Sequence, residues 1–353
     1  MNKNHVTLTC SVKNTFVLKD LELLQSMGYH VNLIQSPPFK DPIRFFWNRI
    51  REFFLGFLYL SRSQALFSWF NDYHTWGPLF WAHFFGKPSV LIVGGFDAVA
   101  SPKLEYGLFL KNNLRQYLGK KNYKKAREIW VVHQSLAEGC DQAMKESSTR
   151  SGIKQFIPTL QTPIYEVPTA YDSSFWKAAQ TKSPRSVLTV ANLSDHRTFN
   201  RKGIPFFFEL AKRLPSFKFT VVGIQNQDQS LGVLPTNVIL LGKQSRSELK
   251  KIYGEHQYYF QGSLIEGLPN VLCEAMLSEC IPIGKAVFGI PDAIGKTGMT
   301  FHSQADLDEV VLFLTKENNG LGRLARARIK EKYPIERREN TFKNFLNNIK
   351  NHA

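Results

Sequence analysis

Hydrophobic positions follow two different spacings along this chain. Val17, Leu21, Leu24 and Met27 fall on one helical face before Gly28, a plausible stop. Short apolar runs typical of buried strands occur at 6–12, 30–34, 66–70, 89–93, 129–132, 186–191, 217–223, 238–242, 257–260 and 281–283. Strands that alternate with helices in this way predict parallel sheets covered on both faces. We therefore expect an α/β chain.

The chain is long enough for more than one domain. Its 353 residues, 43% of them hydrophobic, can bury a large core, and this length favours two domains. A polar segment, residues 177–185, is the best candidate for the linker between them. The strand and helix pattern on each side of it predicts a Rossmann-like domain in each half.

Residues 262–276 combine several signals in one stretch. They follow the strand-like run 257–260 and lead into a helix with one apolar face. Pro269 suits the first helical position, and Gly267 suits the turn before it. The N–H groups of Leu268, Asn270 and Val271 are then left without intrahelical partners. Such a helix start holds a phosphate or another anion.

Two carboxylates accompany this predicted anion site. Glu266 precedes the helix and Glu274 lies in its second turn. If the helix opens at the end of a parallel sheet, both carboxylates line the crevice in which ligands of such sheets bind. A carboxylate beside a phosphate must face neutral hydroxyls, which sugars supply. The stretch predicts a site for a phosphorylated sugar; alternatively, Glu266 is a loop carboxylate and Glu274 supports a helix.

The run E-G-L-P-N-V-L-C-E-A-M, with Ser263 before it and residues 281–284 after it, resembles the signature of the retaining glycosyltransferases of family 4. This family uses the GT-B fold, in which two Rossmann-like domains face each other across a cleft. The resemblance implies that Glu266 contacts hydroxyls of the donor sugar and that Glu274 contacts the ribose of the nucleotide. It is strong over residues 186–345 and moderate over the first domain.

The resemblance also implies a domain organisation with a separate role for each domain. Residues 1–176 would form the acceptor domain, residues 186–334 the nucleotide-sugar donor domain, and residues 335–353 a C-terminal helix that returns to the first domain. The expected partners are a nucleotide-sugar co-substrate, such as a UDP- or GDP-sugar, and a glycan or lipid-linked acceptor. The product would be a cell-surface polysaccharide or a glycolipid.

A basic pair follows the first strand of the second half. Arg201 and Lys202 stand before Gly203, after a predicted loop at 192–200. In the family a Lys-Gly at this place supplies a cation to the donor's diphosphate, and an Arg precedes it. Lys202 matches the Lys, and either Arg197 or Arg201 takes the place of the Arg. The alternative is a pair of solvated loop charges.

Asp97 ends a Gly-Gly-Phe-Asp turn after the strand at 89–93. In the family a comparable strand ends in a Gly-x-Asp turn that faces the cleft. Asp97 is therefore a candidate for positioning the acceptor or the donor sugar, and the alternative is an Asp that caps a turn. The glycine-rich turn that follows the first strand in many family members is replaced here by residues 11–15.

No metal or other cofactor is expected. Asp306 and Asp308 form an Asp-x-Asp pattern, but Ser303 and Asp306 also fit the capping pattern of a helix start, and we favour capping. The cysteines show no CxxC pair and no histidine cluster at zinc spacing, which suits reduced thiols in a cytosolic protein. They are Cys10, Cys140, Cys273 and Cys280.

The formal net charge of +16 indicates an anionic partner. Residues 43–60 are aromatic-rich with interspersed arginines, which suits either a membrane interface or burial in the first domain. Residues 111–127 carry seven Lys and Arg, which suits either a solvated helix face or contact with anionic lipid. We find no signal-peptide pattern and no apolar run of membrane-spanning length. A cytoplasmic enzyme with peripheral contact to the inner face of the membrane is the hypothesis.

Two other functional classes remain open. A sugar-nucleotide epimerase or a phosphorylase can share the fold. A nucleic-acid binder would explain the charge, but not the two glutamates beside an anion site, and the chain lacks zinc-finger spacing and RNP aromatics. Nucleic acid is therefore not an expected partner.

Overall fold

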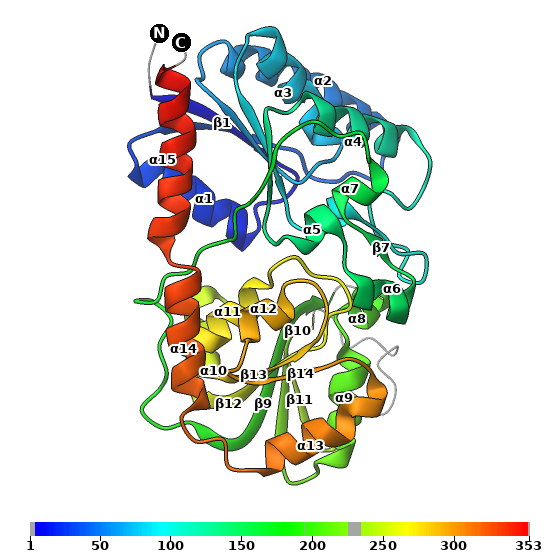
Figure 1. Ribbon diagram of the computed structural model, residues 1–353, viewed down its shortest axis with the longest axis vertical. Helices are drawn as coiled ribbons and strands as arrows, with labels where there is room; N and C mark the ends of the chain where they lie inside the picture. Colours follow the sequence, from blue (N-terminus) through cyan, green and yellow to red (C-terminus); the bar gives the residue numbers. More distant parts are fainter. Residues whose placement is uncertain (1–3, 194, 225–233, 352–353) are drawn as a thin grey trace.

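Two six-stranded parallel sheets, each flanked by helices, form two α/β units stacked along the long axis of the molecule (Figure 1). The computed structural model describes residues 4–193, 195–224 and 234–351. Two Rossmann-like units that face each other are the arrangement expected from the sequence, and the predicted fold class is confirmed.

The first sheet has the strand order β2-β1-β3-β4-β6-β8. β2 lies on one side of β1 and β3 lies on the other, so the direction in which the chain adds strands reverses between β1 and β3. Helices α1 (Thr15–Ser26), α2 (Pro42–Leu60), α3 (Tyr73–Phe84) and α4 (Leu114–Lys125) belong to this unit. Its strands are β1 (His5–Cys10), β2 (His30–Gln35), β3 (Leu66–Trp69), β4 (Ser89–Val93), β6 (Glu128–Val131) and β8 (Ile164–Glu166).

Smaller elements extend the first unit toward the second. The antiparallel pair β5 (Val99–Ala100) and β7 (Arg150–Ser151) holds this region together. The helices around it are α5 (Ser135–Glu138), α6 (Asp141–Ser147) and α7 (Ile153–Phe156). The lower right of the first unit in Figure 1 shows them beside the second unit.

The second sheet has the order β11-β10-β9-β12-β13-β14, with the reversal between β9 and β12. Its strands are β9 (Ser183–Leu193), β10 (Lys218–Ile224), β11 (Val238–Leu241), β12 (His256–Gln261), β13 (Ile281–Lys285) and β14 (Met299–Phe301). Its helices are α8 (His196–Arg201), α9 (Ile204–Arg213), α10 (Arg246–Glu255), α11 (Asn270–Leu277), α12 (Ile290–Ile294), α13 (Leu307–Thr315) and α14 (Leu321–Lys332).

Two local predictions for this unit need correction. The predicted linker overlaps β9, which already begins at Ser183. The predicted loop at 192–200 contains α8, because the Asp195 side chain accepts the Thr198 N–H at 2.7 Å and caps a helical turn. Residue 194 of that loop lies outside the described residues.

The last helix, α15 (Ile335–Asn351), runs back along the first unit (Figure 1). Arg338 on α15 donates to both carboxylate oxygens of Asp20 on α1, at 2.5 and 2.6 Å, and both side chains are buried. Phe342 packs edge-on against Phe67 and Trp130 of the first sheet. The C-terminal helix α15 thus contributes to the hydrophobic core of the first unit.

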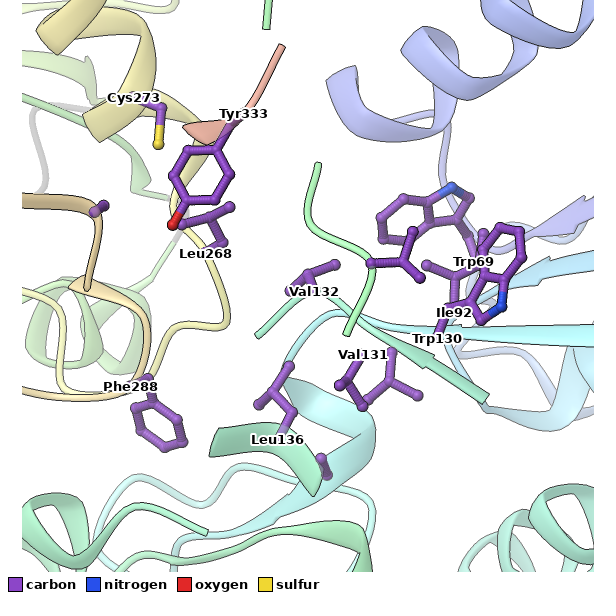
Figure 2. Packing of buried hydrophobic residues seen from close by; sticks show 14 of the residues in the cluster. Trp69, Ile92, Trp130, Val131, Val132, Leu136, Leu268, Cys273, Phe288 and Tyr333 are labelled. Carbon is purple, nitrogen blue, oxygen red and sulfur yellow. The ribbon is translucent and has the colours of Figure 1, made fainter. Parts of the chain in front are cut away.

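One hydrophobic cluster continues from the first sheet into the second unit. Figure 2 shows Val132 and Leu136 of the first unit on the side that faces Leu268 and Phe288 of the second. A shared apolar core fixes the two units against each other, and it therefore fixes the space between them. The four cysteines are unpaired.

Across the parts of the chain that the structure describes, no helix combines the length and the apolar character that crossing a membrane requires.

Candidate functional site

A cleft of about 580 Å³ opens where the reversal points of the two sheets face each other. Lys13 and Asn14 follow β1, and Phe70 follows β3. From the second unit, Asn192 lies at the end of β9 and Glu266 lies in the loop after β12. Open parallel sheets bind ligands at the carboxyl ends of the strands that flank such a reversal, and this cleft has two such points.

A chain of buried side chains fixes the carboxylate of Glu266. Tyr259, Gln261 and Ser263 alternate along β12 and its extension, so they share one face. The Tyr259 hydroxyl donates to Gln261 Oε1 at 3.2 Å, and Gln261 Nε2 donates to Ser263 Oγ at 2.7 Å. Ser263 Oγ then donates to Glu266 Oε1 at 3.0 Å. The carboxylate is therefore held in one orientation at the cleft wall.

Lys202 forms an ion pair with Glu266 because the α8–α9 junction lies directly against the end of β12. The Leu264 N–H donates to the Arg201 carbonyl oxygen at 2.8 Å. Gly203 has φ +70°, and a Cβ there would lie 1.9 Å from the Gly262 carbonyl oxygen. Only glycine permits this approach, so Gly203 sets the position of the lysine before it.

The cleft is electropositive. Among its described lining residues are one carboxylate, Glu266, and four cations: Lys13, Arg201, Lys202 and Lys243. Burial alone would raise the pKa of Glu266, but the charges of Lys202 and Arg201 outweigh it and hold that pKa below its ordinary value. Glu266 is thus ionised at neutral pH, and the remaining excess of positive charge favours an anionic ligand.

The amino end of α11 opens into this cleft. The helix begins at Asn270 with Pro269 as its N-cap, so it starts one residue later than predicted, and Leu268 lies outside it. Leu268, Pro269, Asn270 and Val271 all line the cleft. Asn270 Oδ1 is buried and has no hydrogen-bond partner in the described structure. An unpaired polar atom beside the first helical N–H groups points to an absent polar ligand.

Glu274 lies in the second turn of α11, as predicted, but its carboxylate already has a partner. It is buried in α11 and pairs with Lys19 of α1 at 3.1 Å, and the described lining of the cleft does not include it. Lys19 Nζ lies 4.4 Å from the centre of the Tyr171 ring and lines a separate cavity of about 260 Å³. Of the two glutamates, the described lining of the cleft includes Glu266, and a nucleotide-binding role for Glu274 stays a prediction.

The two candidate arginines differ in position. The Arg201 guanidinium lies over the Tyr106 ring, 4.6 Å from its centre, and Arg201 lines the cleft. Arg197 is 65% exposed, pairs with Glu105 at 3.4 Å and is not part of the described cleft lining. Arg201 is therefore the arginine that this structure places beside Lys202.

Gly267 lies at the contact between the two units. A Cβ there would lie 2.5 Å from Val132 Cγ2 and 2.7 Å from the Gly94 carbonyl oxygen. The predicted turn after β4 therefore meets the predicted turn before α11, backbone against backbone. Gly267 shapes the floor of the cleft without lining it.

Asp97 is fully buried and does not face the cleft. Its carboxylate accepts the N–H groups of Gly95 at 3.0 Å, Asn71 at 3.1 Å and Gly94 at 3.3 Å. Burial raises the pKa of Asp97 to about 7, although these donors favour the carboxylate. Its interpretation as an acceptor-side residue is thus corrected, and the alternative, a carboxylate that caps a turn, describes what is seen.

Both acidic groups of the Asp-x-Asp pattern have hydrogen-bond partners within the protein. Asp306 Oδ2 accepts the N–H groups of His302 and Ser303, and a capping box with Ser303 is formed as predicted. Asp308 Oδ1 accepts a hydrogen bond from Arg213 at 2.6 Å. The capping interpretation of Asp306 is confirmed.

A cluster of one histidine and two carboxylates joins residues of the two units. The side-chain nitrogen and oxygen atoms of His133, Glu166 and Asp292 lie within 4.8 Å of one another. Lys332 Nζ contacts Asp292 Oδ2 at 2.5 Å. Because an ammonium group already neutralises this carboxylate, the group is better described as an ion-pair cluster than as a cation site.

Comparison with known proteins gives a family for part of the chain. Residues 184–316 match the family model of the group 1 glycosyl transferases. This span includes Lys202 and Glu266. No curated protein matches the sequence significantly.

Solved structures share the whole fold at low sequence identity. A sucrose-phosphate synthase from Thermosynechococcus elongatus superposes with a TM-score of 0.75 at 12% identity, over 99% of this chain and 100% of the other. A glycosyltransferase from Rickettsia africae gives 0.69 at 11% identity, over 100% of both chains. The catalytic domain of starch synthase IV from Arabidopsis thaliana, bound to ADP and acarbose, gives 0.65 at 12% identity, over 98% and 99%. These likenesses show the GT-B fold.

Proposed function

We propose that this protein is a retaining glycosyltransferase that moves a sugar from a nucleotide-sugar donor to a hydroxyl group of a glycan or lipid-linked acceptor. One observation carries the proposal: the Glu266–Lys202 pair lies at the amino end of α11, inside a cleft formed by the reversal points of both sheets. The match of residues 184–316 to group 1 glycosyl transferases supports it. So does the ADP bound to the structurally similar starch synthase.

The positive side of the cleft would hold the diphosphate of the donor. Arg201, Lys202, Lys243 and the residues at the start of α11 all line this space. Cleavage of the bond between sugar and phosphate builds negative charge on the leaving diphosphate. Preorganised donors aimed at that charge lower the barrier, typically by about 3 kcal/mol for a single well-placed group.

Glu266 would orient the sugar. Its lowered pKa keeps it ionised at neutral pH, so it can accept hydrogen bonds from sugar hydroxyls while Ser263 holds its other side. Lys202 pairs with this carboxylate and lines the same cleft as the start of α11, and in this proposal it also contacts the diphosphate. In this proposal the leaving phosphate takes the acceptor proton on the same face of the sugar, so no separate base is needed.

Glu274 would take part only after a change of partner. We propose that it binds the ribose of the nucleotide, as the family resemblance implies, and its pairing with Lys19 must then give way or be shared. Glu274→Ala should weaken nucleotide binding more than it slows the transfer step. If this variant keeps its nucleotide affinity, the role of Glu274 is only structural, through its ion pair with Lys19 of the first unit.

The proposal requires no metal ion. Four cationic side chains in the cleft outnumber its single carboxylate and can offset the charge of a diphosphate. We expect transfer to continue unchanged in the presence of a chelator.

The test begins with a panel of nucleotide sugars, screened for thermal stabilisation of the purified protein. Nucleotide release is then measured with and without glycan and lipid-linked acceptors. Glu266→Ala and Lys202→Ala should each abolish transfer with little loss of folding. The matched control is the exposed pair of Lys154 and Glu138, whose Ala variants should retain full activity.

The products distinguish the alternatives. An epimerase would convert the donor sugar without any acceptor, and a phosphorylase would release a sugar phosphate. Full turnover by Glu266→Ala or Lys202→Ala would remove the assignment of the site.

A further inference from the structure

Helices α2, α3 and α4 expose an unusual concentration of apolar side chains. Ten of the eighteen large hydrophobic residues that are exposed in the described structure lie on these three helices. Ile43 is 69% exposed, Trp47 63% and Phe84 66%. The three helices lie next to one another at the upper right of Figure 1, on the first unit. The ten are Ile43, Phe46, Trp47, Phe54, Phe57, Leu58, Trp76, Phe84, Leu114 and Tyr117.

This aromatic face is ordered by its own packing. Phe53 on α2 contacts the rings of Trp76, Phe80 and Trp81 on α3, with centroids 4.9 to 5.9 Å apart. Two close glycine contacts bring the helices together. A Cβ at Gly56 would lie 3.0 Å from Trp81 Cδ1, and one at Gly77 would lie 3.3 Å from the Phe53 Cα. The exposed rings are therefore presented on a rigid helix pair.

Lysines border this face directly. Lys121, Lys124 and Lys125 are exposed on α4, and Lys125 Nζ lies 5.8 Å from the centre of the Phe80 ring on α3. The basic helix thus lies directly beside the aromatic helix pair (Figure 1).

Exposed acidic side chains are missing from all three helices. Helices α3 and α4 contain no Asp or Glu. The single acidic residue of α2, Glu52, is buried and paired with Arg49 at 2.7 Å. Arg115 of α4 pairs with Asp72 just before α3, whereas the lysines of α4 have no exposed acidic side chain within these three helices.

We propose that the α2–α4 surface docks this protein on a bilayer that contains anionic lipids. The aromatic and aliphatic side chains would enter the interface between headgroups and acyl chains, while the α4 lysines would lie near lipid phosphates. Only a bilayer offers an apolar layer and an anionic layer side by side over such an area. A two-fold dimer through this face would instead bring two cationic helices together.

This inference does not depend on the proposed transfer reaction, because binding is measured without donor or acceptor. The full-length protein is sedimented with vesicles of phosphatidylcholine alone, or of phosphatidylcholine with phosphatidylglycerol, at low and high salt. We expect binding to the anionic vesicles that weakens with salt, because salt screens the lysine–phosphate attraction.

Two pairs of substitutions test the two components. Lys121→Glu with Lys124→Glu should reduce the partition coefficient about fivefold or more for each lysine charge removed. Phe46→Ser with Trp47→Ser should reduce it while leaving its salt dependence unchanged. The matched controls are Leu312→Ser, at an exposed site on α13, and Lys316→Glu, which should bind as the parent protein does.

Thermal denaturation of each variant checks that the fold is intact. Equal binding to neutral and anionic vesicles, no binding at low salt, or unchanged binding by both pairs of variants would overturn the proposal. A concentration-dependent dimer that both pairs of substitutions abolish would show that a second copy of the chain occupies this face.

Discussion

Glu266 and Asp97 carry the same functional group, and their surroundings give them different roles. Glu266 is 16% exposed at its side chain, and its cationic partner, Lys202, also lines the cleft. Asp97 is fully buried and accepts three backbone N–H groups of the first unit. The first carboxylate can exchange partners with a ligand, and the second cannot.

Asp97→Ala should therefore destabilise the fold rather than act on the reaction. Two buried N–H groups and a partly buried one would lose their acceptor, and we expect the free energy of unfolding to fall by about 3 kcal/mol or more. Urea denaturation measures this. The control is Asp172→Ala: Asp172 accepts the Ser174 and Phe175 N–H groups in a more accessible turn, and its loss should cost about 1 kcal/mol. Equal costs at the two sites would contradict the role of burial.

The sequence is compatible with both interpretations of Asp97, a sugar-positioning residue or a turn cap, and does not distinguish them. A Gly-Gly-x-Asp turn after a strand has the same local pattern whether its carboxylate points out or in. Lys13 and Lys243 show the same limit, because nothing in their neighbours along the chain marks them as cleft residues. Their role arises from the position of β1 and β11 in sheets that assemble over long sequence distances.

At the scale of elements, strongly periodic segments were predictable and their ends were not. The apolar runs at 89–93 and 281–283 became β4 and β13, and Ser303 and Asp306 form the predicted capping box. The start of α11 moved by one residue, because the φ of Pro269, −73°, suits the N-cap as well as the first helical position. The Asp195-x-x-Thr198 pattern was the overlooked signal for α8.

Gly203 lies where the α8–α9 junction contacts the end of β12, and a substitution there tests whether this contact positions Lys202. Gly203→Ala should destabilise the protein and weaken donor binding, because its Cβ would displace the Gly262 backbone and move Lys202 away from Glu266. The matched control is Gly28→Ala: its φ is +85°, but nothing lies within 4 Å of the added Cβ. Chemical denaturation and nucleotide titration should show a stability loss in both variants and an affinity loss in Gly203→Ala alone. Wild-type affinity in that variant would separate the glycine from the site.

At the scale of the whole molecule, buried ion pairs join segments that are far apart in sequence. Arg338 and Asp20 are 318 residues apart, and Lys19 and Glu274 are 255 apart. A single sequence shows neither pair, because nothing local to either partner identifies the other. This is why the sequence pointed to both glutamates of the signature but did not show that one of them pairs with Lys19.

Arg338→Leu should leave Asp20 buried without its cationic partner, and the free energy of unfolding should fall by about 3–5 kcal/mol. The double variant Asp20→Asn, Arg338→Leu should recover a large part of this loss, because it also removes the stranded charge. Equilibrium denaturation of the two variants gives the comparison. A double variant no more stable than the single one would mean that packing, rather than charge, dominates at α15.

The return of α15 gives the chain two passages between its halves, and these passages touch. The Tyr171 N–H on the first passage donates to the Tyr333 carbonyl oxygen on the second at 3.1 Å. Both passages run along the edge formed by α14 and α15, whereas Glu146 of α6 pairs with Lys285 of β13 near the opposite edge (Figure 1). Opening of the halves about this tethered edge would separate the opposite edge most. Widening the gap for a bulky molecule in this way would break the Glu146–Lys285 contact.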